Sequence, residues 1–384
     1  MYEPKKGEMF YSTLTSLRWF YLYPSKKDSE NWKLYAIKAV IVRIITSFGF
    51  IECWLHLIMS IIENAPVNLA EDIEGITGYG NSVFVCCMFQ YMCTDWSTFF
   101  KDLTDVIRFG KPPEYDNAVK KTNLFSSLYY VFTTVSVILY GIVSFFDTKQ
   151  CKLMNERKGT HEICDAVTPL WWPSAYMNPW VKAFITAYLL LSCEYYLPAS
   201  GVVSVIVWES TILIEAKINH LKVLFKDCLN DDDPTRKREK LNFCIRYHLE
   251  IYRLCDEINR LSKWIIGQLS FAAAIVIGCI ANQMIKQYSV GSMFHLVGYT
   301  IVVFLACHTG QIIKNKTYDI QDALYESKWI DVDREMARDV QFVILRCQTP
   351  AVLKAIPLGT FDYSVWIVIL KTSYSYVTLL TKQA

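Results

Sequence analysis

Seven long apolar stretches divide this chain. They occupy residues 37–62, 75–94, 125–146, 180–207, 265–285, 293–313 and 361–381. Each is close to the ~20 residues that an α-helix needs to cross ~30 Å of hydrocarbon. Only a helix lets one such segment satisfy its own backbone N–H and C=O groups in lipid. The stretches therefore predict an all-α, polytopic membrane protein with seven transmembrane helices.

The basic residues gather in every second gap between these stretches. Of the 39 Lys and Arg residues, 29 lie in the N-terminal arm and in the gaps after the second, fourth and sixth stretches. Only six lie in the alternate gaps. Because basic loops stay on the cytoplasmic side, this pattern predicts a cytoplasmic N-terminus and an extracellular C-terminus. G-protein-coupled receptors have the opposite polarity and are disfavoured.

No motif of an enzyme or a cofactor site is present. The chain contains no G-x-S-x-G, H-E-x-x-H or P-loop sequence. Its six histidines are scattered, without a second ligand at metal spacing. The net charge of +2 averages over the two membrane faces and indicates no nucleic-acid partner. We therefore expect no catalysis, cofactor or metal.

Two long gaps have helical rather than loop composition. Apolar residues recur at the helical period from 208 to about 225, and residues 230–234 (NDDDP) then break the helix. A second helix is predicted from Thr235 onward and a third over 332–347. The predicted organisation is a ligand-binding bundle (1–207 with 265–313), a helical cytoplasmic anchor domain (208–263 and 314–359) and a last helix (360–384) with Thr360 as its N-cap.

The predicted cytoplasmic helices each carry an apolar stripe. Such stripes must be buried against a partner, and acidic residues interrupt their polar faces too often for helices that lie on a lipid surface. We expect a packed domain that is shared between subunits. The predicted subunit-interface residues are His248, Tyr252, Met336, Val340, Val343 and Ile344.

The outer halves of the membrane stretches predict a small-molecule pocket. The second stretch begins with small and polar residues, and aromatic and apolar residues share helical faces in the third and fourth. An aromatic-lined hollow with a few hydroxyls fits a small volatile molecule. Ordinary helix packing through small residues is the alternative. The candidate ligand-binding residues are Tyr79, Phe84, Ile138, Gly141, Phe145, Phe184 and Tyr188.

Two cysteines share one predicted extracellular loop. Cys151 and Cys164 could close a small ring there, and two free thiols are the alternative. The other cysteines lie mostly in membrane stretches or cytoplasmic gaps, where disulfides are rare.

The last membrane stretch carries a polar stripe. Ser375, Tyr376, Leu379, Lys382 and Gln383 follow one another along one helical face. One helix cannot enclose a channel, so a pore would need several subunits around an axis, with Leu379 as its apolar constriction. A stripe that is buried inside a monomeric bundle is the alternative.

The end of the chain resembles a known family. Residues 369–380, ILKTSYSYVTLL, are similar to the C-terminal signature of insect odorant receptors, and Tyr247-His248-Leu249 also looks like that family. Length, number of spans and inverted topology agree. The resemblance implies an odorant-gated, non-selective cation channel, a tetramer of this subunit and the olfactory co-receptor, in the plasma membrane of an olfactory neuron dendrite. Four last helices would line the pore, and the anchor helices would join the subunits.

The resemblance also assigns pore positions. The apolar gate of the family falls on Leu379, whereas its pore glutamine and the next apolar residue fall on Lys382 and Gln383. A lysine beside a cation path is repulsive, which fits a heteromer whose co-receptor supplies most of the pore helices. A gustatory receptor channel of the same superfamily and a metabotropic seven-span receptor are the alternatives. The pair Ser375-Tyr376 favours the odorant branch.

Overall fold

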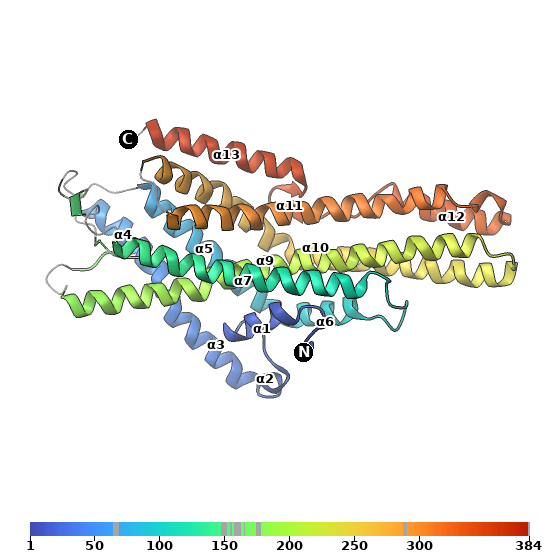
Figure 1. Cartoon of the computed structure of the whole chain (residues 1–384), viewed down its shortest axis with the longest axis horizontal. Coiled ribbons are helices and arrows are strands. Elements are labelled where there is room, and N and C mark those ends of the chain that lie inside the picture. The colour runs from blue at the N-terminus through green and yellow to red at the C-terminus, as the bar shows by residue number, and fades with distance from the viewer. Residues whose placement is uncertain are drawn as a thin grey trace.

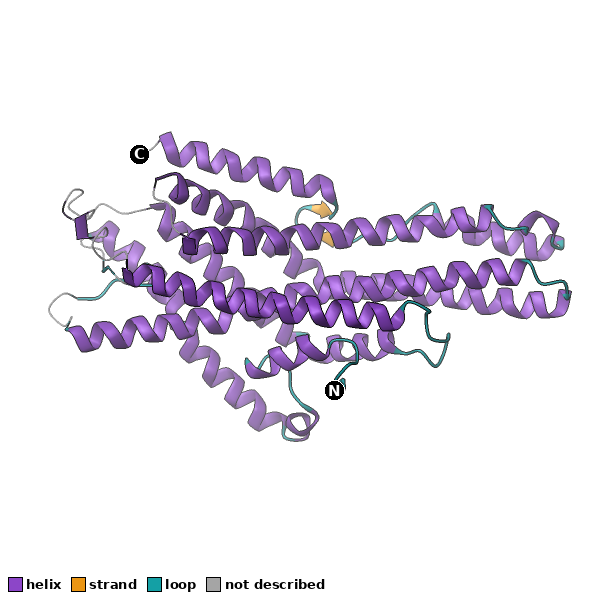
Figure 2. Ribbon diagram, in the orientation of Figure 1, coloured by secondary structure: helices purple, strands orange, loops and turns teal. Residues whose placement is uncertain are grey.

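Long helices that run along one axis make up most of the molecule. The computed structural model describes residues 1–63, 69–146, 152–153, 156, 163–164, 166–173, 178–286 and 290–382. Figure 1 shows the helices side by side along the longest axis, with the C-terminus and α12 toward opposite ends. The all-α prediction is confirmed, because the strands in the described residues are two short segments beside α13 (Figure 2).

The predicted membrane stretches are helical. The helices that contain the first, second, third, sixth and seventh stretches are α3 (Trp32–Thr46) with α4 (Phe48–Ile62), α5 (Leu69–Tyr91), α7 (Tyr115–Phe146), α11 (Val290–Tyr325) and α13 (Tyr363–Lys382). The first stretch is therefore two helices that meet at Ser47. By length and apolar composition, five helical segments of the described chain could span a membrane. The helices α5 and α13 are more polar and are not among the five.

The fourth and fifth stretches belong to much longer helices. Helix α9 (Pro179–Leu229) begins where the Asn178 side chain accepts a hydrogen bond from the Val181 N–H at 2.8 Å. Helix α10 (Pro234–Lys286) begins where Asp233 accepts one from the Thr235 N–H at 3.0 Å. Asn and Asp are preferred at such N-caps. The predicted break between the two helices is confirmed.

Shorter elements complete the fold. They are α1 (Tyr11–Trp19), α2 (Lys26–Glu30), α6 (Cys93–Thr104), η2 (Trp329–Asp331), α12 (Arg334–Cys347), β1 (Lys354–Ala355) and β2 (Gly359–Thr360). Helix α12 is capped by Asp333, which accepts hydrogen bonds from the N–H groups of Glu335 and Met336. We call residues 208–263 and 314–359 the helical extension. Its α9, α10 and α12 parts reach one end of the long axis in Figure 1.

The antiparallel β1–β2 pair sits where α10 and α11 carry glycines. A Cβ atom on Gly267 would lie 2.0 Å from the Ile356 carbonyl oxygen, and one on Gly310 would lie 1.8 Å from that of Phe361. Only glycine leaves room for such close backbone contact. Thr360 lies in β2, so the prediction that it is the N-cap of α13 is wrong. Asp362 has that role, because its side chain accepts a hydrogen bond from the Ser364 N–H at 2.9 Å.

Helix α13 packs against α10 with one face. A Cβ atom on Gly278 would lie 2.7 Å from Cβ of Tyr376 and 2.9 Å from the carbonyl oxygen of Ser373. Ser373 and Leu380 are buried on this face. The close approach of the two backbones therefore depends on a small residue in α10.

Candidate functional site

A cavity of about 130 Å³ lies among α5, α7, α9 and α11, with one residue of α10 in its wall. For comparison, an engineered cavity of about 150 Å³ holds benzene. Most of the lining is apolar or aromatic. Its aromatic side chains are Tyr79, Tyr129, Phe132, Tyr140, Phe294 and Tyr299, beside the imidazole of His295. The cavity is therefore suited to a compound about the size of one ring.

Helices α5 and α11 form a polar wall of this cavity. Glu71, Glu74 and Asn81 come from α5, and His295 comes from α11. The Nδ1 atom of His295 lies 3.2 Å from Oε1 of Glu74, which is buried. Ionisable groups are costly inside a membrane and mark functional sites there. The wall therefore distinguishes this cavity from a packing defect between apolar helices.

The structure places one of the seven predicted pocket residues in the cavity wall. Tyr79 lines the cavity, and its hydroxyl donates a hydrogen bond to the Thr46 carbonyl at 2.8 Å. The small and polar start of the second stretch also belongs to the wall, through Gly75, Gly78, Asn81 and Ser82. Five residues of the second stretch therefore line this cavity.

The other predicted pocket residues lie outside the lining. Phe184 and Ile138 are exposed on the surface of the chain, and Phe84 is half-buried on another face of α5. Gly141 packs against Leu190, and the Tyr188 hydroxyl donates to the Ile45 carbonyl. The side chain of Phe145 lies outside the described residues. These positions lie away from this cavity because their helices turn another face toward it.

Three aromatic residues and a serine on α7 line the cavity but were not predicted to do so. Tyr129, Phe132, Ser136 and Tyr140 line the cavity and follow one helical face at i, i+3, i+7 and i+11. The predicted residues Ile138 and Gly141 lie on other faces. The combination of aromatic rings with hydroxyls in the α7 row was a usable signal, because lipid-facing surfaces are more uniformly aliphatic. The ionisable residues Glu74 and His295, at the starts of the second and sixth apolar stretches, were a second signal.

The predicted subunit-interface residues are buried within the chain itself. His248, Tyr252, Met336, Val340, Val343 and Ile344 are each at most 5% exposed. They hold α12 against α10 and α11, and Nε2 of His248 lies 3.5 Å from Sγ of Cys347. The guanidinium of Arg346 lies 3.9 Å from the centre of the Tyr252 ring. Burial and the nearby Arg346 lower the pKa of His248 to about 4. The prediction that these six residues contact another subunit directly is wrong, because they are buried within their own chain.

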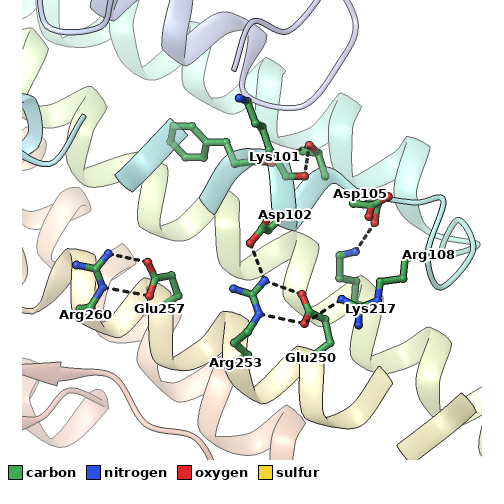
Figure 3. Close-up of polar contacts among 11 residues, drawn as sticks. Lys101, Asp102, Asp105, Arg108, Lys217, Glu250, Arg253, Glu257 and Arg260 are labelled. Carbon is green, nitrogen blue, oxygen red and sulfur yellow. Dashed lines mark hydrogen bonds and ion pairs between the residues drawn. The ribbon is translucent and has the colours of Figure 1, made fainter. Parts of the chain in front are cut away.

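Ion pairs join α6, which directly follows α5, to α10. Asp102 accepts from Arg253 at 2.7 Å (Figure 3). Asp95 accepts from Arg260 at 2.9 Å. The two aspartates are seven residues apart on α6, and the two arginines are seven residues apart on α10. The spacing of the partners therefore matches along the two antiparallel helices. Glu250 and Glu257, one turn before the arginines, bind the same guanidinium groups. We call Asp95, Asp102, Arg253 and Arg260 the α6–α10 clasp.

A buried lysine lies beside this clasp. Lys217 of α9 is 3% exposed, and its Nζ donates to the Asp105 carbonyl at 3.0 Å (Figure 3). Burial lowers its pKa to about 8. The segment after α6 is therefore fixed to α9 as well as to α10. The wall helix α5 is connected through α6 to the helical extension.

The predicted pore stripe is partly exposed on α13. Ser375 and Leu379 are exposed, and Leu379 keeps 52% of its surface. Tyr376 is half-buried against Gly278. The side chain of Lys382 and the whole of Gln383 lie outside the described residues. A stripe that is wholly buried within one chain does not fit this exposure.

One cysteine of the predicted pair is described. Cys164 is buried and disulfide-bonded. Cys151 lies outside the described residues, so the pairing of these two cysteines stays a prediction. Within the described part of the chain, no cluster of three or more His, Cys, Asp or Glu side chains could hold a metal ion.

Comparisons with solved structures agree with this architecture. The olfactory receptor OR5 of Machilis hrabei superposes with a TM-score of 0.75 over 97% of this chain and 98% of the receptor, at 15% identity. That structure is a complex with eugenol. A second structure of the same receptor gives a TM-score of 0.74. The seven-helix fold is therefore shared at low sequence identity.

The sequence of this chain is also similar to those of several insect odorant receptors. Odorant receptor 30a of Drosophila melanogaster is 23% identical over 54% of this chain, and odorant receptor Or2 of Anopheles gambiae is 26% identical over 37%. These matches span 55% and 39% of the two relatives' own lengths. Odorant receptor 85c of Drosophila melanogaster is 22% identical, and the match covers 75% of both chains.

The sequence model of the family 7tm Odorant receptor matches residues 75–374, which is most of the chain. The matched region includes the cavity helices, the helical extension and most of α13. Together with the shared fold, this identifies a multi-pass membrane receptor. The chain belongs to the insect odorant receptor family.

Proposed function

We propose that this receptor is the odorant-binding subunit of a ligand-gated, non-selective cation channel that it forms with the olfactory co-receptor. The observation that carries the proposal is the exposed face of α13. This helix packs against α10 with one face and leaves Ser375 and Leu379 uncovered on the other. The Ser375 hydroxyl donates to the Lys371 carbonyl of the same helix at 3.0 Å, but the charged side chain of Lys371 is exposed on the surface of the chain. A charge on a membrane helix needs water or a partner subunit. Both are present if several such helices surround a pore.

A direct mechanical path supports the coupling between odorant and pore. Helix α10 contributes Leu269 to the cavity wall and contacts α13 at Gly278. These two positions are nine residues apart, which is about 13 Å along the helix. An odorant opens the pore only if it binds the open state more tightly than the closed one. A small displacement of α10 by the odorant would move α13 directly.

The proposed membrane orientation places the helical extension in the cytoplasm and the cavity in the outer half of the bilayer, at the plasma membrane. The extension would then join subunits. Its exposed apolar side chains include Leu249, Phe342 and Leu345, each at least 59% exposed. We assign the contact with the co-receptor to these side chains in place of the six buried residues.

Blocking the cavity tests the odorant site. A Cβ atom on Gly298 makes only an ordinary contact, 3.6 Å from the Phe132 ring. In cells that also express the co-receptor, Gly298→Trp should fill the cavity and abolish odorant currents, while Gly298→Ala retains them. A co-receptor agonist should still open the Gly298→Trp channel. Odorant responses that survive the tryptophan would show that odorants bind elsewhere.

Changing the gate tests the pore. Leu379→Ala should remove an apolar constriction and raise the current without odorant. Unchanged currents and gating would refute the gate position. In an excised patch without nucleotide or G protein, odorant-evoked currents should persist. Their loss on excision would favour a metabotropic seven-span receptor instead.

A further inference from the structure

The polar wall of the cavity contains hydrogen-bond acceptors that the described chain leaves unused. Oε2 of Glu74, Nε2 of His295 and Oδ1 of Asn81 are buried and have no hydrogen-bond partner among the described residues. Glu74 is 8% exposed and Asn81 2%. All three residues line the cavity. A buried polar atom without a partner has lost its hydrogen bonds to water without replacement, so a ligand that bonds to these atoms recovers that cost.

The chemistry of these atoms selects a donor. A carboxylate can only accept hydrogen bonds. The Nδ1 atom of His295 lies 3.2 Å from Oε1 of Glu74, which assigns the Nδ1–H donor to that contact. In the neutral imidazole, Nε2 is then an acceptor. The wall therefore presents two acceptors from Glu74 and His295 together, and a third from Asn81, two helical turns away on α5.

The charge of the wall excludes one class of ligands. Glu71 and Glu74 both line the cavity, one turn apart on α5. Their carboxylates would repel an organic anion in a medium of low dielectric constant. The remaining lining is aromatic, and the cavity of about 130 Å³ limits the ligand to roughly one ring with a short substituent.

We propose that the cavity binds a ring-sized volatile with one hydrogen-bond donor, a hydroxyl or an amine, that bonds to Glu74 and His295, and that it rejects carboxylic acids. This inference rests on the proposed function, in which the cavity is the odorant site. A site that is built to accept a hydrogen bond discriminates strongly against an analogue without the donor, because its own buried groups then stay unpaired.

A series of probes on one carbon skeleton tests the donor. Benzyl alcohol, benzylamine, toluene, benzyl methyl ether and benzoic acid would be applied to cells that express this receptor and the co-receptor. Half-maximal concentrations for the alcohol or the amine should be about tenfold to a hundredfold lower than for toluene and the ether. Benzoic acid should be inactive. Equal responses to toluene or the ether, a response to the acid, or no response to any probe would overturn the proposal.

Substitutions then identify the acceptor. Glu74→Gln keeps the shape but removes the charge and adds a donor. It should abolish the response to benzylamine and reduce the preference for the alcohol over the ether to about threefold or less, because the amide can donate to the ether oxygen. If the alcohol alone activates and Glu74→Gln leaves its preference unchanged, Glu74 is not the acceptor. Retained responses to the amine would also exclude Glu74.

Two controls separate this inference from folding and from the proposed function. Glu52→Gln removes another buried membrane carboxyl, on α4 and outside the cavity lining, and should leave the probe order unchanged. Currents with a co-receptor agonist check that each variant reaches the membrane and opens. If Gly298→Trp leaves all probe responses intact, the proposed odorant site fails. If it abolishes them but the donor makes no difference, only the ligand class fails.

Discussion

The two ends of this receptor differ in how tightly their helices pack. In the helical extension, Phe225, Leu254, Leu261 and Leu324 are fully buried. The adjoining α6–α10 clasp pairs each of its arginines with two carboxylates. Around the cavity, α5, α7, α9 and α11 leave a hollow of about 130 Å³ and three buried acceptors that have no partner among the described residues.

The contrast indicates where the molecule is held rigid and where it recognises a ligand. Buried polar atoms without a partner among the described residues also occur in the extension, on Tyr247, Tyr252 and Gln321, but those of the polar wall line a space that a ligand can enter. The dense extension holds the ends of α9 and α10 in place. The looser bundle at the other end can then bind a ligand without unfolding. Each of the following predictions tests this division.

The largest effect is expected where two backbones meet. Gly310→Ala would place a Cβ atom 1.8 Å from the Phe361 carbonyl oxygen, so the start of α13 must move. We expect loss of correctly folded channel at the cell surface, measured by surface labelling and by odorant current. Gly298→Ala, on the same helix at the cavity, is the matched control and should be nearly neutral. If both variants behave alike, packing at the two sites is equally tolerant.

A pair of core substitutions should separate the two regions by stability. Leu254→Ala in the extension empties a fully buried site and should cost about 2–5 kcal/mol. Leu197→Ala only enlarges an existing cavity and should cost less than about 2 kcal/mol. Thermal unfolding of the purified receptor measures both. The reverse order would mean that the membrane bundle carries the greater part of the stability.

The buried His248 of the extension should make the folding stability of the receptor depend on pH. Its pKa in the folded chain is lowered to about 4, so the unfolded chain binds a proton that the folded chain excludes. Stability should be constant above about pH 6.5 and fall by about 1.4 kcal/mol per pH unit from there toward pH 4. His248→Gln should flatten this slope in thermal unfolding at several pH values. An unchanged slope would show that other groups titrate.

The smallest effect is expected at the α6–α10 clasp. Its arginines are half-exposed, so solvent screens each pair to about 0.2–1 kcal/mol. Asp102→Asn should therefore destabilise the receptor slightly and shift the odorant concentration for half-maximal current by at most about fivefold. Combining Asp102→Arg with Arg253→Asp should restore both values. If the exchange fails to rescue, the pair does not act as a charge contact.

Much of the fold follows from the sequence. The apolar stretches predicted the membrane helices, and NDDDP at 230–234 predicted the break between α9 and α10. The caps Asn178, Asp233 and Asp333 were not predicted, although each is a residue type that is preferred at an N-cap. The division of the first stretch at Ser47 was not predicted, because the nearby Gly49 is a single glycine, and a single glycine does not by itself end a helix.

The candidate site depended on information that periodicity does not contain. A membrane helix has apolar side chains on all faces, so those that face lipid and those that line a cavity look alike in sequence. For this reason α7 was assigned the wrong face, and Phe132 and Tyr140 were missed. The same limit explains the anchor helices, where stripes such as Val340 and Ile344 proved to be buried within one chain.

The sequence by itself determined that this chain is a helical membrane protein, that a break separates α9 from α10, and to which family the chain belongs. These properties depend on local composition and on short motifs. Only the tertiary structure showed that Glu74 meets His295, from helices more than 200 residues apart, and that α10 joins the cavity wall to α13. Such contacts depend on how helices rotate and pack against one another, which distant side chains decide together.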